Sequence, residues 1–192
     1  PAEATWEFNT DGDTEGWIPN GKIKDLAAKD GVMTATIAAN ITDPFIGVTG
    51  VPPWDANDVT GVLARMRSSV DISTAGGKQF FWFNPSHTSK GYEVSDSNDW
   101  QIVFVDLLGE ANWTGAVDRI RFDLADGLGE DRTVEFDWIR LESLYLTNET
   151  FEWGNLLGWE VMGNPEDFND LEVETVNSFS YAVKCTGTGE YH

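Results

Sequence analysis

Apolar and polar residues alternate with a two-residue period along most of the chain up to residue 143, and this period constrains the fold more than any other feature. Such alternation places one set of side chains on each face of a β-strand. Turn-forming sequences rich in Gly, Asp and Asn separate the alternating segments, and no segment shows sustained helical amphipathicity. The sequence therefore predicts an all-β fold, an antiparallel β-sandwich. The expected strands are 32–38, 61–67, 78–83, 100–107, 118–124 and 134–142.

The pattern at the start of the chain begins again near residue 146. The sequence TWEFNTDGDTEGW (5–17) is similar to TFEWGNLLGW (150–159), and DGVMTATIA (30–38) is similar to SFSYAVKCTG (178–187). The later segment has strand material for only part of a sandwich, and an isolated strand pair is marginal in water. We therefore predict one domain over 1–145 and an incomplete second β-sandwich over 146–192. The second domain is either truncated or completed by another chain through self-association.

The charge balance excludes several kinds of partner. The chain has 33 Asp and Glu against 12 Lys and Arg, which gives a formal net charge of −21. Nucleic acids and anionic membranes are repelled by such a surface at long range. No apolar run approaches the roughly 20 residues of a membrane-spanning helix, so no membrane insertion is expected. The single cysteine, Cys185, cannot form an internal disulfide.

The WEFN and EGW motifs near the start and the VEFDWIRLE strand (134–142) resemble bacterial carbohydrate-binding modules of the jelly-roll, galactose-binding-like type. The resemblance covers residues 5–143, and 146–192 is similar to the start of a sister module. It implies a jelly roll that binds polysaccharide without catalysis. It also implies an extracellular or cell-surface location within a larger secreted protein, because such modules accompany polysaccharide-degrading enzymes. An alternative stays open: a structural subunit of an extracellular filament or surface layer assembled from β-sandwich domains.

The first and last strands of a jelly roll lie close together, so we expect Glu7 and Asp137 to share one site. Modules of the resembled type often hold a structural calcium ion there. Ca²⁺ takes roughly six to eight oxygen ligands from carboxylates and backbone carbonyls. The sequence therefore predicts Ca²⁺ at these two residues, and the alternative is that they pair with Arg140 or Arg121.

Most arginines lie inside the expected strands. Alternation places Arg65 with Arg67 on one face, and Arg119 with Arg121 on one face, opposite the core side chains. Two facing pairs form a basic stripe that hydrogen-bonds sugar hydroxyls or a uronate carboxylate. Arg65 and Arg67 are therefore predicted to bind a ligand. The alternative is cross-strand pairing with the acidic residues Glu93, Asp123 or Glu135.

Exposed aromatic side chains stack on sugar rings, whereas most aromatic residues of a sandwich lie in its core. We predict that Trp54 and Trp113, in turn-rich segments, and Trp82 and Tyr92, on a sheet face, bind the ligand. The alternative for each is that it anchors a loop. Strand position assigns to the core Trp6, Trp17, Phe81, Phe83 and Trp138.

No catalytic motif is present, since the sequence lacks G-x-S-x-G, H-E-x-x-H and a Gly-rich phosphate loop. His87 is expected in a loop, and His192 has no partner at metal-ligand spacing. We therefore expect no enzymatic activity. N-glycosylation sequons occur at Asn40, Asn112 and Asn148, and they matter only in a host that glycosylates.

Overall fold

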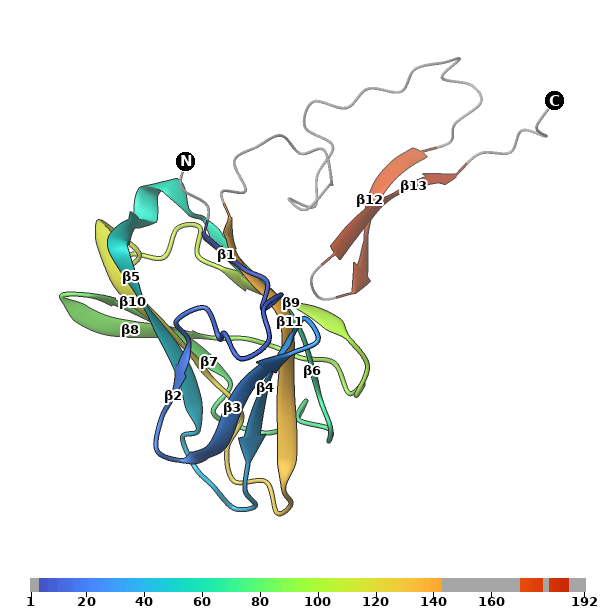
Figure 1. Cartoon of the computed structure of the whole chain (residues 1–192). Coiled ribbons are helices and arrows are strands. Elements are labelled where there is room, and N and C mark those ends of the chain that lie inside the picture. The colour runs from blue at the N-terminus through green and yellow to red at the C-terminus, as the bar shows by residue number, and fades with distance from the viewer. Residues whose placement is uncertain (1–3, 143–169, 178–179, 187–192) are drawn as a thin grey trace. The chain divides into compact units, whose positions relative to one another are not determined.

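The computed structural model describes residues 4–142, 170–177 and 180–186 (Figure 1). The chain divides into two compact units, Pro1–Ser143 and Leu144–His192, close to the boundary predicted after residue 145. In unit 2 the described residues form one antiparallel strand pair, β12 (Asp170–Asn177) and β13 (Ser180–Thr186). The second sandwich and the sequon at Asn148 fall largely outside the described residues. No helix in the described part of the chain is long and apolar enough to cross a membrane.

Unit 1 consists of two antiparallel sheets packed face to face (Figure 1), which confirms the predicted β-sandwich. Sheet A contains, in spatial order, β3 (Ile23–Lys29), β4 (Val32–Ile37), β11 (Arg132–Glu142), β6 (Gly61–Ser68) and β9 (Gln101–Asp106). The short strand β1 (Ala4–Trp6) also pairs with β11. Sheet B contains, in order, β2 (Ile18–Pro19), β5 (Phe45–Asp55), β10 (Ala116–Asp123), β7 (Gln79–Asn84) and β8 (Ser86–Gly91).

The core lies between the sheets, and Phe122 of β10 is at its centre. The Phe122 ring packs against Phe80, Tyr92, Phe136 and Trp17, with ring centroids 5.1, 5.6, 5.8 and 6.1 Å away. Phe80 belongs to sheet B and Phe136 to sheet A, so this cluster joins the two inner faces. Aromatic pairs at these separations stabilise a core beyond the area that they bury.

The opening motif of the chain (5–17) packs β1 against the core. Trp6 and Trp17 are buried, as predicted, and meet edge to face at 5.3 Å. The Glu15 carboxylate accepts hydrogen bonds from the backbone N–H groups of Glu7 (3.0 Å) and Phe8 (2.8 Å). Phe8 has a φ of 53°, so its backbone is left-handed and cannot continue the ladder of β1. The Glu15 carboxylate supplies the partner that these amides would otherwise lack.

Strands β2, β3, β5 and β8 are not among the strands that the alternation predicts. β3 and β8 are edge strands, and β8 consists of the mostly polar residues SHTSKG. The long strand β5 contains two glycines and two prolines, which usually mark turns. His87 therefore lies in β8, and the prediction that it sits in a loop is wrong.

The two faces of β7 are the reverse of the prediction. Trp82, expected on the surface, is 0% exposed, whereas Phe81 and Phe83, expected in the core, are half-buried on the outer side. The Trp82 Nε1–H donates to the backbone carbonyl of Asn112 (2.9 Å). The run FFWF is apolar on both faces. It therefore indicates a strand but does not indicate which set of residues points inward.

The inward position of Trp82 predicts a large difference between neighbouring substitutions. Trp82→Ala leaves a cavity and should lower the free energy of unfolding by about 3–5 kcal/mol. Phe83→Ala, on the outer side of the same strand, should cost about 1 kcal/mol or less. Urea unfolding of both variants measures the difference. Equal losses would contradict the orientation of β7.

Candidate functional site

The arginine pairs of β6 and β10 lie on different sheets. Arg65 and Arg67 project from the outer side of sheet A, and Arg119 and Arg121 project from the outer side of sheet B. Each pair shares one face, as the alternation predicts. The prediction that both pairs form a single basic stripe is wrong, because the two outer surfaces of a sandwich point in opposite directions. We call them face A, which carries Arg65, Arg67, Trp100, Trp138 and Arg140, and face B, which carries Phe45, Phe81, Phe83, Arg119 and Arg121.

On face A, each arginine lies over an indole ring and is paired with a carboxylate. The Arg65 and Arg67 guanidinium carbons lie 4.9 and 4.6 Å from the centroid of the Trp100 ring. Arg65 Nη1–H donates to Asp137, and Arg67 Nε–H donates to Glu135. Glu135 is one of the cross-strand partners predicted from the sequence as the alternative to ligand binding.

Arg140 repeats this arrangement on β11. Its guanidinium lies 4.3 Å from the Trp138 ring centroid, and its Nη2–H donates to Glu7 Oε1 (3.0 Å). Trp138 is half-buried on face A, so its assignment to the core is wrong. It occupies the outer surface because β11 has a register shift between Phe136 and Trp138, which interrupts the two-residue alternation.

On face B, three rows of side chains run across strands β5, β10, β7 and β8. The register of the four strands sets each row, because cross-strand neighbours on one face are about 4.5–5.5 Å apart. The first row is Thr49, Arg119, Phe83 and His87; the second is Gly47, Arg121, Phe81 and Ser89; the third is Phe45, Asp123, Gln79 and Gly91.

Arg121 is held between two phenyl rings at the middle of face B. Its guanidinium carbon lies 3.8 Å from the Phe45 ring centroid and 4.3 Å from that of Phe81. Both Nε and Nη2 donate to the Asp123 carboxylate, the second bond at 2.7 Å, and Nη2 also donates to Asp43 (2.9 Å). The side chain of Arg121 is 19% exposed and that of Asp123 is 6% exposed. This is a bidentate, largely desolvated ion pair.

The electrostatics of this pair follow from burial and from the partners. Burial raises the pKa of the Asp123 carboxyl, and the hydrogen bonds and charge of Arg121 oppose that rise. For Arg121, burial alone lowers the pKa, but its hydrogen bonds and charge interactions with Asp123 and Asp43 outweigh this and raise it. Arg121 is therefore a fixed cation whose charge is balanced within face B.

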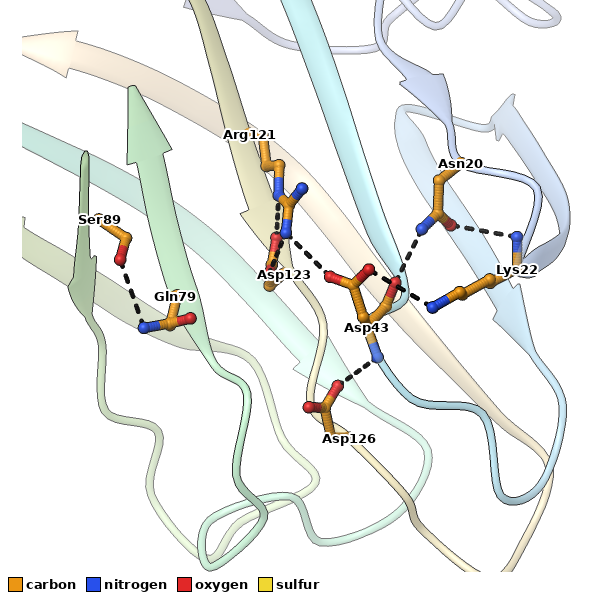
Figure 2. A network of polar contacts seen from close by, with 8 residues as sticks. All are labelled: Asn20, Lys22, Asp43, Gln79, Ser89, Arg121, Asp123 and Asp126. Carbon is orange, nitrogen blue, oxygen red and sulfur yellow. Dashed lines mark hydrogen bonds and ion pairs between the residues drawn. The ribbon is translucent and has the colours of Figure 1, made fainter. Parts of the chain in front are cut away.

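Asp43 extends the pair into a network (Figure 2). Its carboxylate also lies 3.4 Å from Lys22 Nζ, and its backbone carbonyl accepts from Asn20 Nδ2 (2.7 Å). Its backbone N–H donates to Asp126 (2.6 Å). Elsewhere on the same sheet, Gln79 Nε2–H donates to Ser89 (3.4 Å), as Figure 2 shows. The Asp43 network and the separate Gln79–Ser89 bond thus fix carboxylate, amide and hydroxyl groups on sheet B.

Two of the remaining aromatic residues predicted to bind a ligand are core residues, as is Trp82. Tyr92 is buried, and its hydroxyl donates to the backbone carbonyl of Asp123 (2.7 Å); burial raises the pKa of this hydroxyl. Trp113 is also buried, and its Nε1–H donates to the Val59 carbonyl (2.6 Å), which makes it the loop anchor considered as the alternative. Neither ring can stack on a ligand.

Trp54 is half-buried at the end of β5 and meets Trp6 edge to face at 5.7 Å. A Cβ added at Gly50 would lie 2.7 Å from its indole, so Gly50 leaves the space that the ring occupies. The aromatic residues that do line face B, Phe45, Phe81 and Phe83, were not identified from the sequence. Only the strand pairing brings them beside the two arginines, and a single sequence does not give that pairing.

Comparison with known proteins places the fold. No protein-family model and no curated protein sequence matches the chain. Solved structures do resemble it. A glutamate-to-arginine variant of a family 29 carbohydrate-binding module has a TM-score of 0.52 at 14% identity, covering 74% of this chain and 93% of that one. A lysine-to-alanine variant of a family 29 module, in complex with cellulohexaose, has a TM-score of 0.51 at 15% identity, covering 74% and 92%.

Unit 1 has the β-sandwich fold of these carbohydrate-binding modules. At this level of identity the likeness concerns the fold alone, and neither the galactose-binding-like type nor a second module is part of it.

Glu7 and Asp137 are each paired with a different arginine, Arg140 and Arg65. In the described part of the chain, no group of three or more His, Cys, Asp or Glu residues is arranged to hold a metal ion. Calcium at Glu7 and Asp137 stays a prediction.

Calcium bound only by the folded state stabilises it by mass action, so the prediction requires that excess chelator lowers the melting temperature. An unchanged melting temperature, with no calcium by elemental analysis, would contradict it.

The two arginine environments predict different effects on stability. Arg121→Ala leaves the buried Asp123 carboxylate without its counter-ion and should lower the free energy of unfolding by about 2–3 kcal/mol. Arg65→Ala removes a partly exposed pair on face A and should change it by about 0.5 kcal/mol. Thermal or urea unfolding of the two variants makes the comparison. A larger loss for Arg65→Ala would show that face A carries the structural ion pair.

Proposed function

We propose that unit 1 is a non-catalytic module that binds polysaccharide on face B, and that it works outside the cell as part of a larger secreted protein. The observation that carries the proposal is the row pattern of face B, where three half-buried phenyl rings alternate with arginines and fixed polar groups. A polysaccharide presents apolar C–H surfaces and hydroxyl groups in regular succession. Face B offers a complementary partner for each.

The polar groups of face B are fixed before a ligand arrives. Arg121 is held by two carboxylates and two rings, and Gln79 is held by Ser89. Groups that are already ordered lose little conformational entropy on binding, so more of the contact energy appears as affinity. In addition, the exposed Gly91 places no side chain opposite Gln79, which leaves room on the outer face at that point.

Face A is less suited to this role, although it carries tryptophans. Each of its arginines is paired with a carboxylate, and the Trp100 ring already packs against two guanidinium groups. Guanidinium groups also lie over the phenyl rings of face B, so the two faces differ in the arginines themselves: Arg119 on face B stacks on Phe83 without a carboxylate partner in the described part of the chain. The predicted ligand contacts of Arg65 and Arg67 are therefore replaced in this proposal by residues of face B.

The solved modules support the class of ligand. One neighbour is in complex with cellulohexaose, and another is an arginine-to-alanine variant made to probe ligand recognition in family 29 modules. Face B also contains an arginine on a β-sandwich of the same fold, Arg121, whose position is fixed by two carboxylates and two phenyl rings.

Binding experiments with matched variants test the proposal. The full chain should bind cellohexaose or a soluble β-linked polysaccharide in isothermal titration. Phe81→Ala and Phe83→Ala on face B should weaken binding about tenfold, which corresponds to about 1.4 kcal/mol and is typical of one aromatic contact. Trp138→Ala, which removes an aromatic ring from face A, is the control and should leave binding unchanged.

Loss of binding in Trp138→Ala, with full binding in both phenylalanine variants, would place the site on face A. Absence of binding across a panel of neutral and acidic glycans, together with polymers visible by electron microscopy, would favour the structural-subunit alternative. Melting temperatures of the variants show whether a loss of binding reflects a loss of folded protein.

A further inference from the structure

We infer that face B recognises a uronic acid, a sugar whose C6 carbon is a carboxylate, and that Arg119 binds this carboxylate. The inference rests on the proposed function and names the ligand class of the same site. It starts from the distribution of charge partners among the arginines of unit 1.

Each of the other arginines has at least one carboxylate or carbonyl acceptor on its guanidinium, although Nε and Nη1 of the buried Arg132 have no partner among the described residues. Arg65, Arg67, Arg121 and Arg140 are paired with carboxylates, and the buried Arg132 donates to the backbone carbonyl of Ala125 (2.6 Å). Among residues 4–142, Arg119 is the arginine whose guanidinium has neither a carboxylate nor a carbonyl partner. This is unexpected in a chain with a net charge of −21, where acidic partners are plentiful.

Arg119 is nevertheless held in place. Its guanidinium carbon lies 3.6 Å from the Phe83 ring centroid, the shortest such contact in the described part of the chain. Stacking on an aromatic ring fixes the guanidinium plane and leaves its N–H edges free to donate. The side chain is exposed at the outer surface of β10. An ordered, solvent-facing set of donors without an acceptor is suited to a planar anion that accepts two parallel hydrogen bonds.

The cross-strand neighbours of Arg119 provide no competing negative charge. Thr49 of β5 and Phe83 of β7 lie directly opposite it, and His87 follows in the same row on β8. The acidic groups Asp43 and Asp123 of face B are both engaged by Arg121. A carboxylate that binds Arg119 therefore approaches a row of face B that contains no acidic side chain.

A sugar carboxylate reaches Arg119 when its ring occupies the neighbouring phenyl row. Phe81 and Phe83 are two residues apart on one face of β7, which corresponds to about 6.5–7 Å. This separation is close to the size of one pyranose ring. A ring packed beside Phe81 can thus direct its C6 substituent towards the guanidinium that lies over Phe83.

The overall negative charge does not prevent this recognition of a short ligand. At physiological ionic strength the screening length is about 8 Å, so distant acidic side chains act weakly and contact partners decide the affinity. The same argument predicts a clear salt dependence for a uronate ligand and almost none for a neutral one.

Two hexasaccharides that differ only at C6 test the inference: cellohexaose and the β-1,4-linked hexamer of glucuronic acid. In isothermal titration of the full chain at about 0.15 M salt, the glucuronate hexamer should bind roughly tenfold more tightly, as expected for one charge-assisted bidentate contact. Raising the salt concentration should reduce this preference. Arg119→Gln should abolish it, and Arg119→Lys, which keeps the charge but not the planar fork, should retain only part of it.

Arg65→Gln is the matched control, because Arg65 also lies over an aromatic ring but is paired with Asp137; it should keep the preference. Equal or weaker binding of the glucuronate hexamer, a parallel loss of both ligands in Arg119→Gln, or a lost preference in Arg65→Gln would each overturn the inference. In those cases binding of cellohexaose would leave the proposed function standing. If neither hexamer binds, the proposed function and this inference are both wrong.

Discussion

The packing of Phe122 between the two sheets determines how the rest of unit 1 is arranged. Its ring contacts aromatic residues of both inner faces, so β10 cannot slip in register without breaking that cluster. Because side chains alternate along a strand, the inward position of Phe122 fixes Arg121 and Asp123 on the outside. Tyr92 strengthens the link, since its ring packs on Phe122 while its hydroxyl binds the Asp123 carbonyl. Strand β10 thus contributes side chains to the core on its inner side and to face B on its outer side.

The sequence was informative wherever one face of a strand is apolar and the other polar. GVLARMR and DRIRFDL show this pattern, and they gave both the strands and the shared faces of their arginine pairs. The pattern fails in FFWF, which is apolar on both faces, and in β8, an edge strand with little apolar character. It also contains no information on which strands are neighbours. For that reason the pairing of Arg119 with Phe83, and of Arg121 with Phe45, could not be read from one sequence.

The two outer faces use the same local arrangement, a guanidinium over an aromatic ring, with different electrostatic results. On face A, Glu7, which directly follows β1, and Glu135 and Asp137 of β11 supply a carboxylate to each arginine, so every positive charge there is already paired. On face B, two carboxylates converge on Arg121 and none reaches Arg119. The difference lies in the cross-strand neighbours. The residues opposite Arg119 are Thr49 and Phe83, whereas Arg67 lies opposite Glu135.

The opening motif, which recurs at 150–159, has a structural role in unit 1. Trp6 and Trp17 are buried, the Glu15 carboxylate binds backbone amides, and Glu7 is paired with Arg140. None of these side chains lies on face B. Recurrence of the motif therefore carries no information about a repeated ligand. Residues 150–159 lie outside the described part of the chain, but the hairpin that follows them is described. β12 and β13 pair antiparallel across residues 178 and 179, as β3 and β4 pair across Asp30 and Gly31 after the first copy of the motif. The order of motif and hairpin is thus the same in both units, which is expected if the second begins as the same kind of sandwich.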